Sequence, residues 1–523
     1  MMKARWDLVS GLRGMVLAMT LVMSVTTGRS VQAGGVLFVD DDAPAAGDGL
    51  SWNTAYRFLR DALNTAITGG ISEIRVAQGT YLPDHSESSP TGTGIPDDFF
   101  VLTNGLTLKG GYAGLGNPDP NARDIALYET ILSGDLLDDD GPLFANRNDN
   151  SYQVVFVPGV ASPVVIEGLT IRSGYAIFGT RHGGFLIGNT ADLTIRQCRF
   201  IDNRAWHRGG GIYYDSGSLT IEQCEFRDNF ADIQNSAEGG AIFLQNSSAN
   251  VTDSRFVGNY AESSGGAIYS NFTGQVTIDR CEFYSNWANR SAGGAVLHNS
   301  AGPFLLTNTI LIGNFANVSS GALHIGGTGS KTVRTSTIAF NTAGRRYGGM
   351  LLSNGIASLK SCVLWGNVAS ESVGEAKQVL MEGLVNAVDY CCIEGLTAGF
   401  GGIGNIGDDP LFVDADGADN VIGTEDDDLH LSAGSPCIDT GDPGFVPLPG
   451  ETDFDGQPRI IAGRVDMGMD EAFSLGQDCN LNGIADATDI IDGTSQDCNT
   501  NNIPDECVIA DLTSLDCNSN SVP

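Results

Sequence analysis

The sequence repeats itself every 26 to 30 residues through its middle third. A Gly-Gly-Ala-aliphatic element, as at residues 239–242, alternates with a Phe-x-x-Asn element, as at residues 256–259. One such unit carries short β-type runs and is too small to enclose a core, so the next unit has to cover its apolar face. The chain is therefore expected to fold as an all-β solenoid of stacked copies.

Each copy is expected to hold three short strands: one after the glycines, one at a Leu-Thr-Ile element and one at a Cys-x-Phe element. Three strands and three bends per turn describe a parallel β-helix whose coils climb by about 4.8 Å. Equivalent residues then form columns, and the bend asparagines are expected to hydrogen bond from coil to coil. The predicted inward columns are Ile212, Ile242, Ile268, Val296, Leu323 and Leu351; Ile195, Ile221, Val251, Ile278, Leu306, Val333 and Leu359; and Phe200, Phe226, Phe256, Phe283, Leu311, Ile338 and Leu364.

The composition of the chain outside the clear repeats changes along its length and indicates further segments. Residues 53–67 have the apolar spacing of an amphipathic helix, which is expected to cap the open end of the solenoid. The predicted organisation is a signal peptide at 1–33, an N-terminal cap at 34–70, the β-helix at 71–400 with clear repeats at 183–370, an acidic closing region at 401–473 and a calcium-binding tail at 474–523.

Residues 1–33 combine basic residues, an apolar run and small residues before a cleavage point after Ala33, a pattern typical of a secretory signal peptide. No later segment reaches the roughly 18 uninterrupted apolar residues of a membrane span. The mature protein is therefore expected to be secreted, or held at the cell surface by something other than a transmembrane segment.

The formal net charge is −35, from 63 acidic and 28 basic residues. Such a surface repels phosphate backbones, so nucleic acid is excluded as the expected partner, and cations are favoured. The charge is uneven, because no Lys or Arg follows Arg464.

The alternating GGA[ILV] and FxxN elements of residues 183–370 resemble the repeats of the polymorphic outer membrane proteins, which share the pectate-lyase-like right-handed parallel β-helix fold. The resemblance implies surface display and adhesion. That family exports itself through a C-terminal membrane barrel, but no series of alternating ten-residue strands follows residue 400 here. The segments SPCIDTGD, TDFDGQPRI and VDMGMDE resemble the C-terminal closing region of secreted bacterial β-helix proteins.

The tail contains three copies of an Asp-Cys-Asn motif with a period of 19 residues, starting at Asp478, Asp497 and Asp516. Oxygen ligands at alternate positions, with a glycine at the sharp turn, are typical of a calcium loop. The units resemble thrombospondin type 3 or dockerin repeats, and the alternative is a disordered acidic linker. The predicted Ca²⁺ ligands are Asp478, Asn480, Asn482, Ile484 (by its carbonyl), Asp486, Asp489, Asp497, Asn499, Asn501 and Asp505.

A second acidic segment is either a looser calcium site or a solvated loop; its candidate ligands are Asp414, Asp416, Asp419 and Asp426. The cysteines form two groups. Five occupy one column of the repeat, where Ser and Thr replace them in other copies, which indicates a small, buried and inert position: Cys198, Cys224, Cys281, Cys362 and Cys391. The tail cysteines are expected to form disulfides of undetermined pairing: Cys479, Cys498, Cys507 and Cys517.

An enzymatic site would need carboxylates on one outer face of the solenoid. Asp202 and Asp228 occupy equivalent positions on successive coils, about 5 Å apart, and Arg204 is near. That separation suits a retaining pair of carboxylates, but both residues precede bend asparagines and the following coils have Gly258, Ser285 and Gly313 there, so they are better explained as exposed turn residues. The pattern favours a role without catalysis.

Tyr213, Phe243 and Tyr269 are expected to form one outward column. Such a stripe either stacks on sugar rings or packs under a loop. The favoured function is a secreted or cell-surface β-helix protein for adhesion or for binding a glycan or another partner, with a calcium-stabilised tail. The alternative is a polysaccharide lyase or glycoside hydrolase on the same scaffold.

Overall fold

The computed structural model describes residues 34–159, 162–176, 183–187, 192–232, 236–383, 385–397, 399, 401–432, 434–460, 464–472, 490, 493, 495–497 and 504–510. The predicted signal peptide and most of the predicted calcium tail lie outside these residues.

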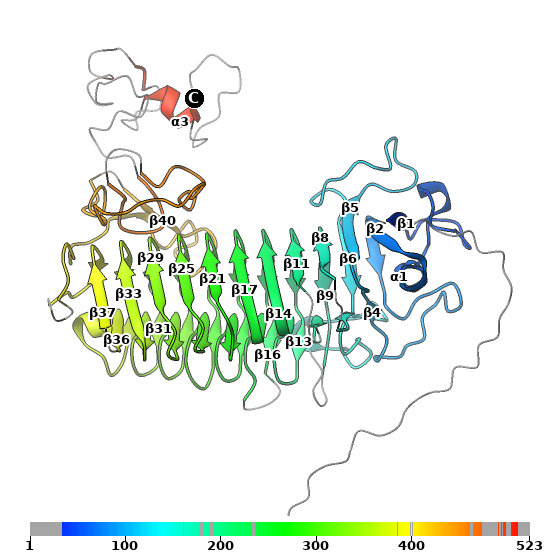
Figure 1. The fold of residues 1–523 in the computed structure, drawn as a ribbon, viewed down its shortest axis with the longest axis horizontal. Coiled ribbons are helices and arrows are strands. Elements are labelled where there is room, and N and C mark those ends of the chain that lie inside the picture. Colours follow the sequence, from blue (N-terminus) through cyan, green and yellow to red (C-terminus); the bar gives the residue numbers. More distant parts are fainter. Residues whose placement is uncertain are drawn as a thin grey trace, which may run out of the picture.

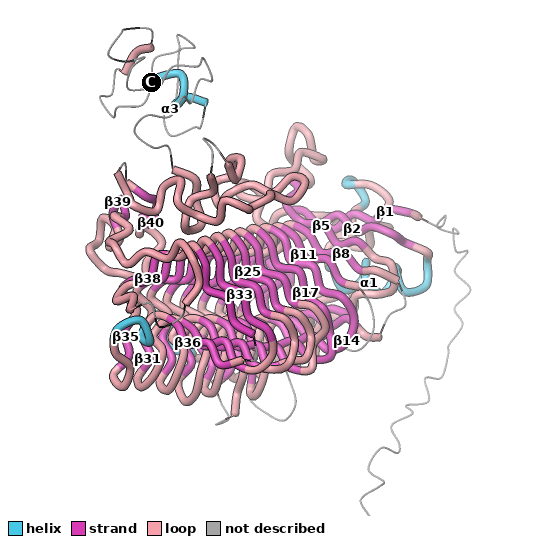
Figure 2. The backbone as a smooth tube through the Cα atoms, turned by 60° about the vertical axis from the view of Figure 1, so that its left-hand side comes forward, coloured by secondary structure: helices cyan, strands magenta, loops and turns pink. Residues whose placement is uncertain are grey.

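Three parallel sheets wind around one apolar core and form a parallel β-helix (Figure 1). They contain 20, 11 and 7 strands, and a separate antiparallel pair follows the solenoid. Figure 2 shows the coils stacked in register, with the C-terminal loops lying along one long edge. The predicted fold class is confirmed.

The 20-stranded sheet consists of two rows of strands that lie side by side, and the long strands β14 and β17 pair with strands of both rows. One row comprises β1 (Gly35–Val39), β2 (Ile71–Ala77), β5 (Thr107–Tyr112), β8 (Val164–Glu167), β11 (Leu193–Arg196), β14 (Ile212–Glu222), β17 (Ile242–Thr252), β21 (Val276–Asp279), β25 (Phe304–Thr307), β29 (Lys331–Arg334), β33 (Ile356–Lys360) and β37 (Val385–Asp389). The other comprises β4 (Phe100–Val101), β7 (Val155–Val157), β10 (Phe185–Ile187), β20 (Ile268–Asn271), β24 (Val296–Asn299), β28 (Leu323–Gly326), β32 (Met350–Ser353) and β36 (Val379–Glu382).

The 11-stranded sheet follows the first bend of each coil. Its strands are β3 (Gly79–Tyr81), β6 (Thr130–Ser133), β9 (Thr170–Arg172), β12 (Arg199–Ile201), β15 (Glu225–Arg227), β18 (Arg255–Val257), β22 (Glu282–Tyr284), β26 (Ile310–Ile312), β30 (Thr337–Ala339), β34 (Val363–Trp365) and β38 (Cys392–Ile393).

The 7-stranded sheet follows the bend asparagines and consists of two-residue strands, so a coil has a fourth short pairing beyond the three that the repeat predicts. These strands are β13 (Arg204–Ala205), β16 (Phe230–Ala231), β19 (Tyr260–Ala261), β23 (Trp287–Ala288), β27 (Phe315–Ala316), β31 (Thr342–Ala343) and β35 (Val368–Ala369).

The remaining described elements are short or terminal. They are η1 (Trp52–Thr54), α1 (Leu59–Gly69), η2 (Pro142–Phe144), η3 (Gly374–Lys377), β39 (Phe412–Asp414), β40 (Asp428–Leu431) and α3 (Asp505–Ala510). α1 lies at the N-terminal end of the solenoid and buries Leu59, Ala62, Leu63 and Ala66 (Figure 1). The predicted helix begins too early, because residues 52–54 form a separate 3₁₀ turn and the α-helix starts only at Leu59.

The predicted columns pair in register, with one exception. Ile242 lies opposite Ile268, and Ile268 opposite Val296, along the parallel ladder. The ladder then pairs Leu323 with Met350, so the prediction of Leu351 as the next inward residue is wrong. The Gly-Gly of that copy is shifted by one residue, because Gly348 and not Gly349 lies against Gly321.

The bend asparagines form a buried ladder through seven coils, as the repeat predicts. Each side-chain amide donates to the side-chain oxygen of the next asparagine at 2.9 to 3.0 Å, and the ladder ends on Gln378. All members are at most 1% exposed: Asn203, Asn229, Asn259, Asn286, Asn314, Asn341 and Asn367.

The seven coils of the asparagine ladder make this bend with a residue in the left-handed backbone region. The position before the bend asparagine has φ between 50° and 66° in Asp202, Asp228, Gly258, Ser285, Gly313, Phe340 and Gly366. Gly, Asp and Asn adopt this region most readily, which explains the residue types that dominate there. Asp202 and Asp228 therefore have a structural reason to occupy their positions.

The cysteine column is buried, as predicted. Cys224 Sγ donates to the carbonyl of Glu222 at 3.3 Å, and Ser254 Oγ makes the equivalent bond to Thr252 at 2.7 Å. Any small side chain with a hydrogen to donate fits this position, so Cys, Ser and Thr interchange. In the tail, Cys507 is disulfide-bonded.

The described part of residues 401–472 packs against the outer side of the 11-stranded sheet. Leu429 and Met469 contact an apolar layer of that sheet that includes Ile310, Ile312 and Ala339. Among the described residues, no helix is both long enough and apolar enough to cross a membrane.

Candidate functional site

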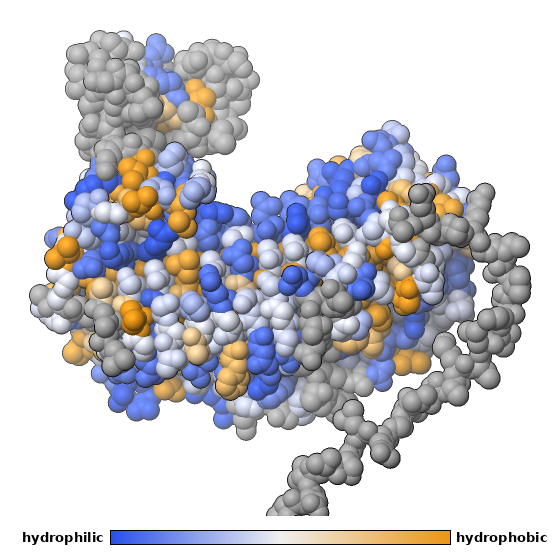
Figure 3. Space-filling view, in the orientation of Figure 1, coloured by the Kyte–Doolittle hydropathy of each residue, from blue (hydrophilic) through white to orange (hydrophobic). Residues whose placement is uncertain are grey.

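A charged groove runs over the outer side of the 11-stranded sheet. It has a volume of about 860 Å³ and lies between two raised segments, the loop around residues 125–130 and the acidic loop of residues 414–428. Figure 3 shows the molecule hollowed between these two raised regions, with mostly hydrophilic residues along the hollow. The floor is contributed by β9, β12, β15, β18 and β22.

The repeat itself builds the groove floor. In each Cys-x-Phe element the Phe points into the core, so the residue before it points out. These outward residues lie opposite one another on successive coils, and they alternate in charge: Arg199, Glu225, Arg255 and Glu282. The repeat places this column on the surface, but its alternation of charge was not used as evidence of a site in the sequence analysis.

A chain of ion pairs crosses the groove from one wall to the other. Arg199 bridges Glu129 of the N-terminal wall at 3.2 Å and Glu225 of the floor at 2.8 Å. Glu225 also bonds Arg227 at 2.6 Å.

The chain continues to the acidic loop, where Glu425 accepts from Arg227 at 2.7 Å and from Arg255 at 3.0 Å. Arg255 in turn bonds Glu282 at 2.8 Å. Glu425 is more than 140 residues from every floor residue in sequence, so only the folded chain shows that the acidic loop completes the groove.

The groove carries an excess of two negative charges, because five carboxylates and three guanidinium groups line it. Burial by itself raises the pKa of Glu225, but hydrogen bonds from Arg199 and Arg227 outweigh burial and lower that pKa. Glu225 therefore stays ionised, and the floor presents alternating fixed donors and acceptors.

The predicted catalytic candidates lie on the next bend, outside the residues that line the groove. Asp202 pairs with Arg147, and Arg204 forms a two-pronged ion pair with Asp232 at 2.7 and 2.9 Å. Burial raises the pKa of Asp228, and the nearby charge of Asp202 adds to this rise. The structure thus places Asp202 and Asp228 on neighbouring coils, whereas the guanidinium of Arg204 is bound to Asp232.

The predicted aromatic stripe pairs in register but is largely covered. Phe243 is 0% and Tyr269 8% exposed, and only Tyr213 is half-buried. Arg208 lies 4.6 Å above the Phe243 ring. The structure therefore fits the packing interpretation of this stripe.

A different aromatic column reaches solvent, on the 7-stranded sheet. Its side chains directly follow the bend asparagines, with ring centroids 4.6 to 6.4 Å apart, and Trp287 is 45% exposed. The members of this aromatic ladder are Phe230, Tyr260, Trp287 and Phe315. The signal for this ladder in the sequence is the tripeptide Asn-aromatic-Ala, which recurs in four consecutive copies.

Of the predicted calcium ligands, only Asp497 and Asp505 are described, and Asp505 lies buried at the start of α3. Asp478, Asn480, Asn482, Ile484, Asp486, Asp489, Asn499 and Asn501 lie outside the described residues. In the acidic loop, Asp426 accepts from the backbone of Asp419. Within the part of the chain that the structure describes, the four carboxylates of this loop do not gather into one metal-binding group.

Comparison with known proteins supports the architecture. The family model described as the right handed beta helix region matches residues 147–310. The crystal structure of pectate lyase Pel9A is similar over 85% of this chain and 98% of its own, with 13% sequence identity and a TM-score of 0.47. No curated protein sequence matches the chain. The solenoid is a right-handed parallel β-helix.

Proposed function

We propose that the protein is a secreted or cell-surface β-helix that binds a polysaccharide in the charged groove. The observation that carries this proposal is the floor of alternating Arg and Glu side chains, held on successive coils between two walls. Its volume of about 860 Å³ falls in the range of about 300–1,000 Å³ typical of ligand sites. A regular polymer of sugar rings suits a floor that itself repeats.

The charge of the groove favours a neutral polysaccharide over a polyuronate. Its excess of two negative charges repels a polymer that carries a carboxylate on every ring. Sugar hydroxyls both donate and accept hydrogen bonds, so they match guanidinium donors next to carboxylate acceptors. Gln197 and Gln223 add amide groups along the same edge.

The test measures binding of a panel of neutral and acidic polysaccharides by calorimetry or on a glycan array. We expect binding of a neutral glycan that the Arg255→Gln variant weakens at least tenfold. Arg290→Gln is the matched control, because Arg290 is an exposed arginine paired with Glu262 away from the groove. If Trp287→Ala loses binding and Arg255→Gln keeps it in full, the glycan binds at the aromatic ladder, and the proposal that it binds in the groove is wrong.

Export and surface display belong to the same proposal. The signal-like residues 1–33 support secretion, and the likeness of residues 183–370 to the repeats of polymorphic outer membrane proteins supports adhesion. Fractionation of cells expressing the full chain, with detection of the protein in medium, surface and cytoplasm, tests this part. Retention in the cytoplasm would contradict it.

We further propose that the tail binds Ca²⁺ through its thrombospondin type 3-like or dockerin-like repeats, with Asp478 and Asp486 as ligands of the first loop. Calorimetry with Ca²⁺ on the full chain is expected to show binding that Asp478→Asn and Asp486→Asn remove. Identical titrations of the wild type and of these variants would rule the assignment out.

An enzymatic function is the second candidate, a polysaccharide lyase or glycoside hydrolase. It is favoured by one observation, the position of Asp228 beside Asp202 on the neighbouring coil, where burial and the charge of Asp202 raise the pKa of Asp228, since a glycosidase needs two carboxyl groups in different environments. Incubation with the same polysaccharides, followed by detection of new reducing ends or unsaturated products, separates catalysis from binding.

A further inference from the structure

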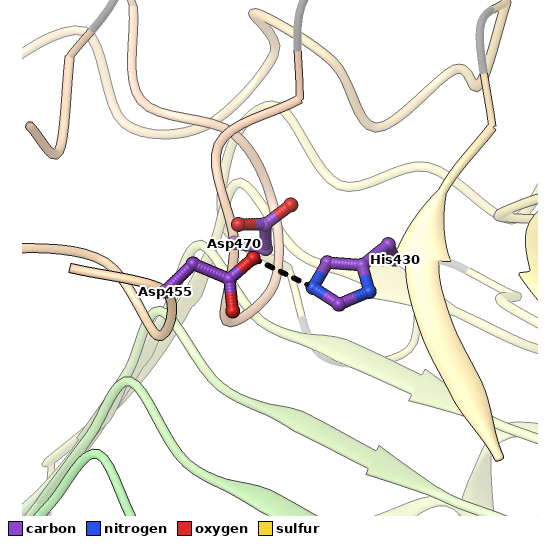
Figure 4. A group of neighbouring side chains, drawn as sticks. All are labelled: His430, Asp455 and Asp470. Atoms are coloured by element: carbon purple, nitrogen blue, oxygen red, sulfur yellow. Dashed lines mark hydrogen bonds and ion pairs between the residues drawn. The ribbon is translucent and has the colours of Figure 1, made fainter. Parts of the chain in front are cut away.

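Three separate segments of the closing region converge on one cluster of side chains (Figure 4). His430 comes from β40, Asp455 from the turn at residues 453–456, and Asp470 from the segment at residues 464–472. Each offers one nitrogen or oxygen atom, and these three atoms lie within 4.8 Å of one another. His430 Nε2 and Asp455 Oδ2 are 3.0 Å apart.

Asp470 supplies an independent indication of a ligand. Asp470 is 7% exposed, and its Oδ1 has no hydrogen-bond partner within the described chain. A buried carboxylate oxygen that meets neither a donor nor a cation is costly, so such an atom in a folded protein points to a missing partner.

The surrounding charges are also unbalanced. Asp453, Asp466 and Glu471 are at most 3% exposed. They form one group around the segment that carries Asp470, because Asp453 accepts from the backbone of Glu471 and Glu471 accepts from the backbone of Asp466. One buried guanidinium faces these carboxylates: Arg459 pairs with Glu471 at 3.0 Å and spends its other bonds on the carbonyls of Met469 and Gly468. A cation at the cluster would reduce this excess of negative charge.

The donor atoms select the kind of ion. Ca²⁺ and Mg²⁺ take oxygen ligands, whereas imidazole nitrogen suits Zn²⁺ and related transition metals. Asp428 Oδ1 lies 2.6 Å from His430 Nδ1. With an ion bound, Asp428 accepts the Nδ1 proton, and Nε2 on the side of Asp455 is the atom that coordinates the metal. A carboxylate that orients a metal-binding histidine in this way is a recurrent feature of zinc sites.

We propose that His430, Asp455 and Asp470 bind a divalent transition-metal ion, with Zn²⁺ as the best fit. Two ligands that each lie about 2.0–2.2 Å from a tetrahedral zinc are roughly 3.4 Å apart, close to the separation of the His430 and Asp455 atoms. The side chains of His430 and Asp455 are 35% and 42% exposed, so the ion enters from solvent and water completes its coordination.

The role of the ion is to hold the closing region together on the solenoid. His430 follows Leu429, and Asp470 follows Met469, and both apolar residues pack in the layer over Ile310 and Ala339. One ion therefore joins three loops directly above the contact that fixes the closing region to the 11-stranded sheet. None of the three proposed ligands is among the predicted Ca²⁺ ligands of residues 478–505.

The experiment uses the full chain after treatment with a chelator and dialysis. Addition of Zn²⁺ is expected to give one bound ion per chain at this site and a rise in Tm, whereas Ca²⁺ does not replace it. Co²⁺ in place of Zn²⁺ is expected to give visible absorption bands of a site with nitrogen and oxygen ligands. His430→Gln and Asp470→Asn are expected to abolish these effects, and His207→Gln, a histidine bonded to Ser236 elsewhere, to leave them unchanged.

Asp428→Asn keeps all three ligands and is expected to weaken Zn²⁺ binding by roughly 10- to 100-fold, as loss of an orienting carboxylate does in other zinc sites. This variant keeps the proposal testable if the ligand variants misfold. Circular dichroism checks that Asp428→Asn itself folds like the wild type, and its Zn²⁺ binding is then measured. The proposal is overturned if the wild type binds no Zn²⁺, or if the ion, the Tm rise and the Co²⁺ bands all persist in Asp470→Asn and His430→Gln.

Discussion

Asn229 and Asn259 lie on successive coils, and the side-chain amide of Asn229 donates a hydrogen bond of 3.0 Å to Oδ1 of Asn259. The same oxygen accepts the backbone N–H of Asn229 at 3.1 Å. Nδ2 of Asn259 donates to the carbonyl of Phe226 and to Oδ1 of Asn286, both at 2.9 Å. The two donors and the two acceptor positions of the Asn259 side-chain amide are all used. An asparagine therefore supplies hydrogen-bond partners to both backbone and side-chain groups at these bends.

Replacing one ladder asparagine is therefore expected to cost more than one hydrogen bond. In Asn259→Ala, four buried groups on the coils above and below each lose one hydrogen bond. Each buried unsatisfied group costs about 1–3 kcal/mol, and some are rescued by water, so we expect the free energy of unfolding to fall by roughly 3–5 kcal/mol. Denaturant titration followed by circular dichroism measures the change.

Asn299→Ala is the matched control for this prediction, because Asn299 is an exposed strand residue on β24. Exposed substitutions of this kind change stability by at most about 0.5 kcal/mol. Equal losses in the two variants would show that the ladder contributes nothing beyond an ordinary strand position.

The period of the repeat was enough to predict the fold, because stacking in register turns sequence spacing into columns. It placed Ile242, Ile268 and Val296 in one line, and the ladders confirm this. The prediction of Leu351 in that line failed because a count from the glycines does not reveal a one-residue shift, whereas the backbone register places Met350 inward. The two-residue strands after the asparagines were too short to give a periodic signal.

The groove was less predictable than the fold. Its floor column follows from alternation along the Cys-x-Phe strands, but its walls come from Glu129 and Glu425, which no repeat relates to the floor. Their position depends on how long loops pack on the solenoid, and sequence spacing carries no such information. The same holds for His430, Asp455 and Asp470, whose segments meet only through the packing of the closing region.

The left-handed bend position predicts effects of different size for two substitutions. Gly258 has a φ of 63°, and a Cβ added to it would lie 2.5 Å from Asp228 Oδ1. Gly258→Ala is therefore expected to lower the free energy of unfolding by about 1–2 kcal/mol, the cost of a left-handed residue with a side chain. Asp228→Gly is expected to stay within about 1 kcal/mol of the wild type, since glycine occupies this position in neighbouring coils.

The same Asp228→Gly variant separates the structural role of this residue from a catalytic one. If Asp228 is a bend residue only, polysaccharide binding and any turnover remain at the level of the wild type. A loss of turnover in a variant with unchanged thermal stability would establish the enzymatic alternative.

The ion pairs of Glu425 are expected to shape the groove more than they stabilise the fold. Glu425, Arg227 and Arg255 have side chains that are 28% to 41% exposed, and exposed ion pairs contribute at most about 1 kcal/mol. Glu425→Gln is therefore expected to change stability by no more than that amount. It is expected to speed amide hydrogen exchange in residues 414–428, because the loop loses its attachment to the groove floor.

Glu371→Gln serves as the control, since Glu371 also binds two arginines at the surface, Arg345 and Arg346. It should leave exchange in residues 414–428 unchanged. Unaltered exchange of the acidic loop in Glu425→Gln would mean that other contacts, such as the bond from Ser285 Oγ to the Gly423 carbonyl, hold the loop by themselves.

Because the His298 side chain is buried, we expect the protein to lose stability in mild acid. It is 1% exposed, its Nδ1 lies 2.7 Å from Ser270 Oγ, and its Nε2 lies 3.3 Å from the carbonyl of Gly302. Burial lowers the pKa of His298 to about 4; the hydrogen bond to the Gly302 carbonyl opposes this shift in part, and the charge of Lys331 adds a smaller effect in the same direction as burial. In the unfolded chain the pKa returns to about 6.5.

Between these two pKa values the unfolded chain binds a proton that the folded chain refuses, so the stability from His298 is complete above about pH 6.5 and is lost as the pH falls to about 4. The loss is at most about 3 kcal/mol for this one group. Lys331 donates to three backbone carbonyls nearby, and burial lowers its pKa.

The variant that isolates this effect replaces the buried polar pair by the residues of its own column. Ser270 and His298 lie between Leu244 and Ile325 in the same inward column, so Ser270→Ala with His298→Leu leaves a continuous apolar column. Removing both partners of a buried hydrogen bond is close to neutral at pH 7. Chemical denaturation from pH 7 to pH 4 is therefore expected to give a shallower decline for the double variant, and parallel curves for the two proteins would show that His298 is not the group that titrates.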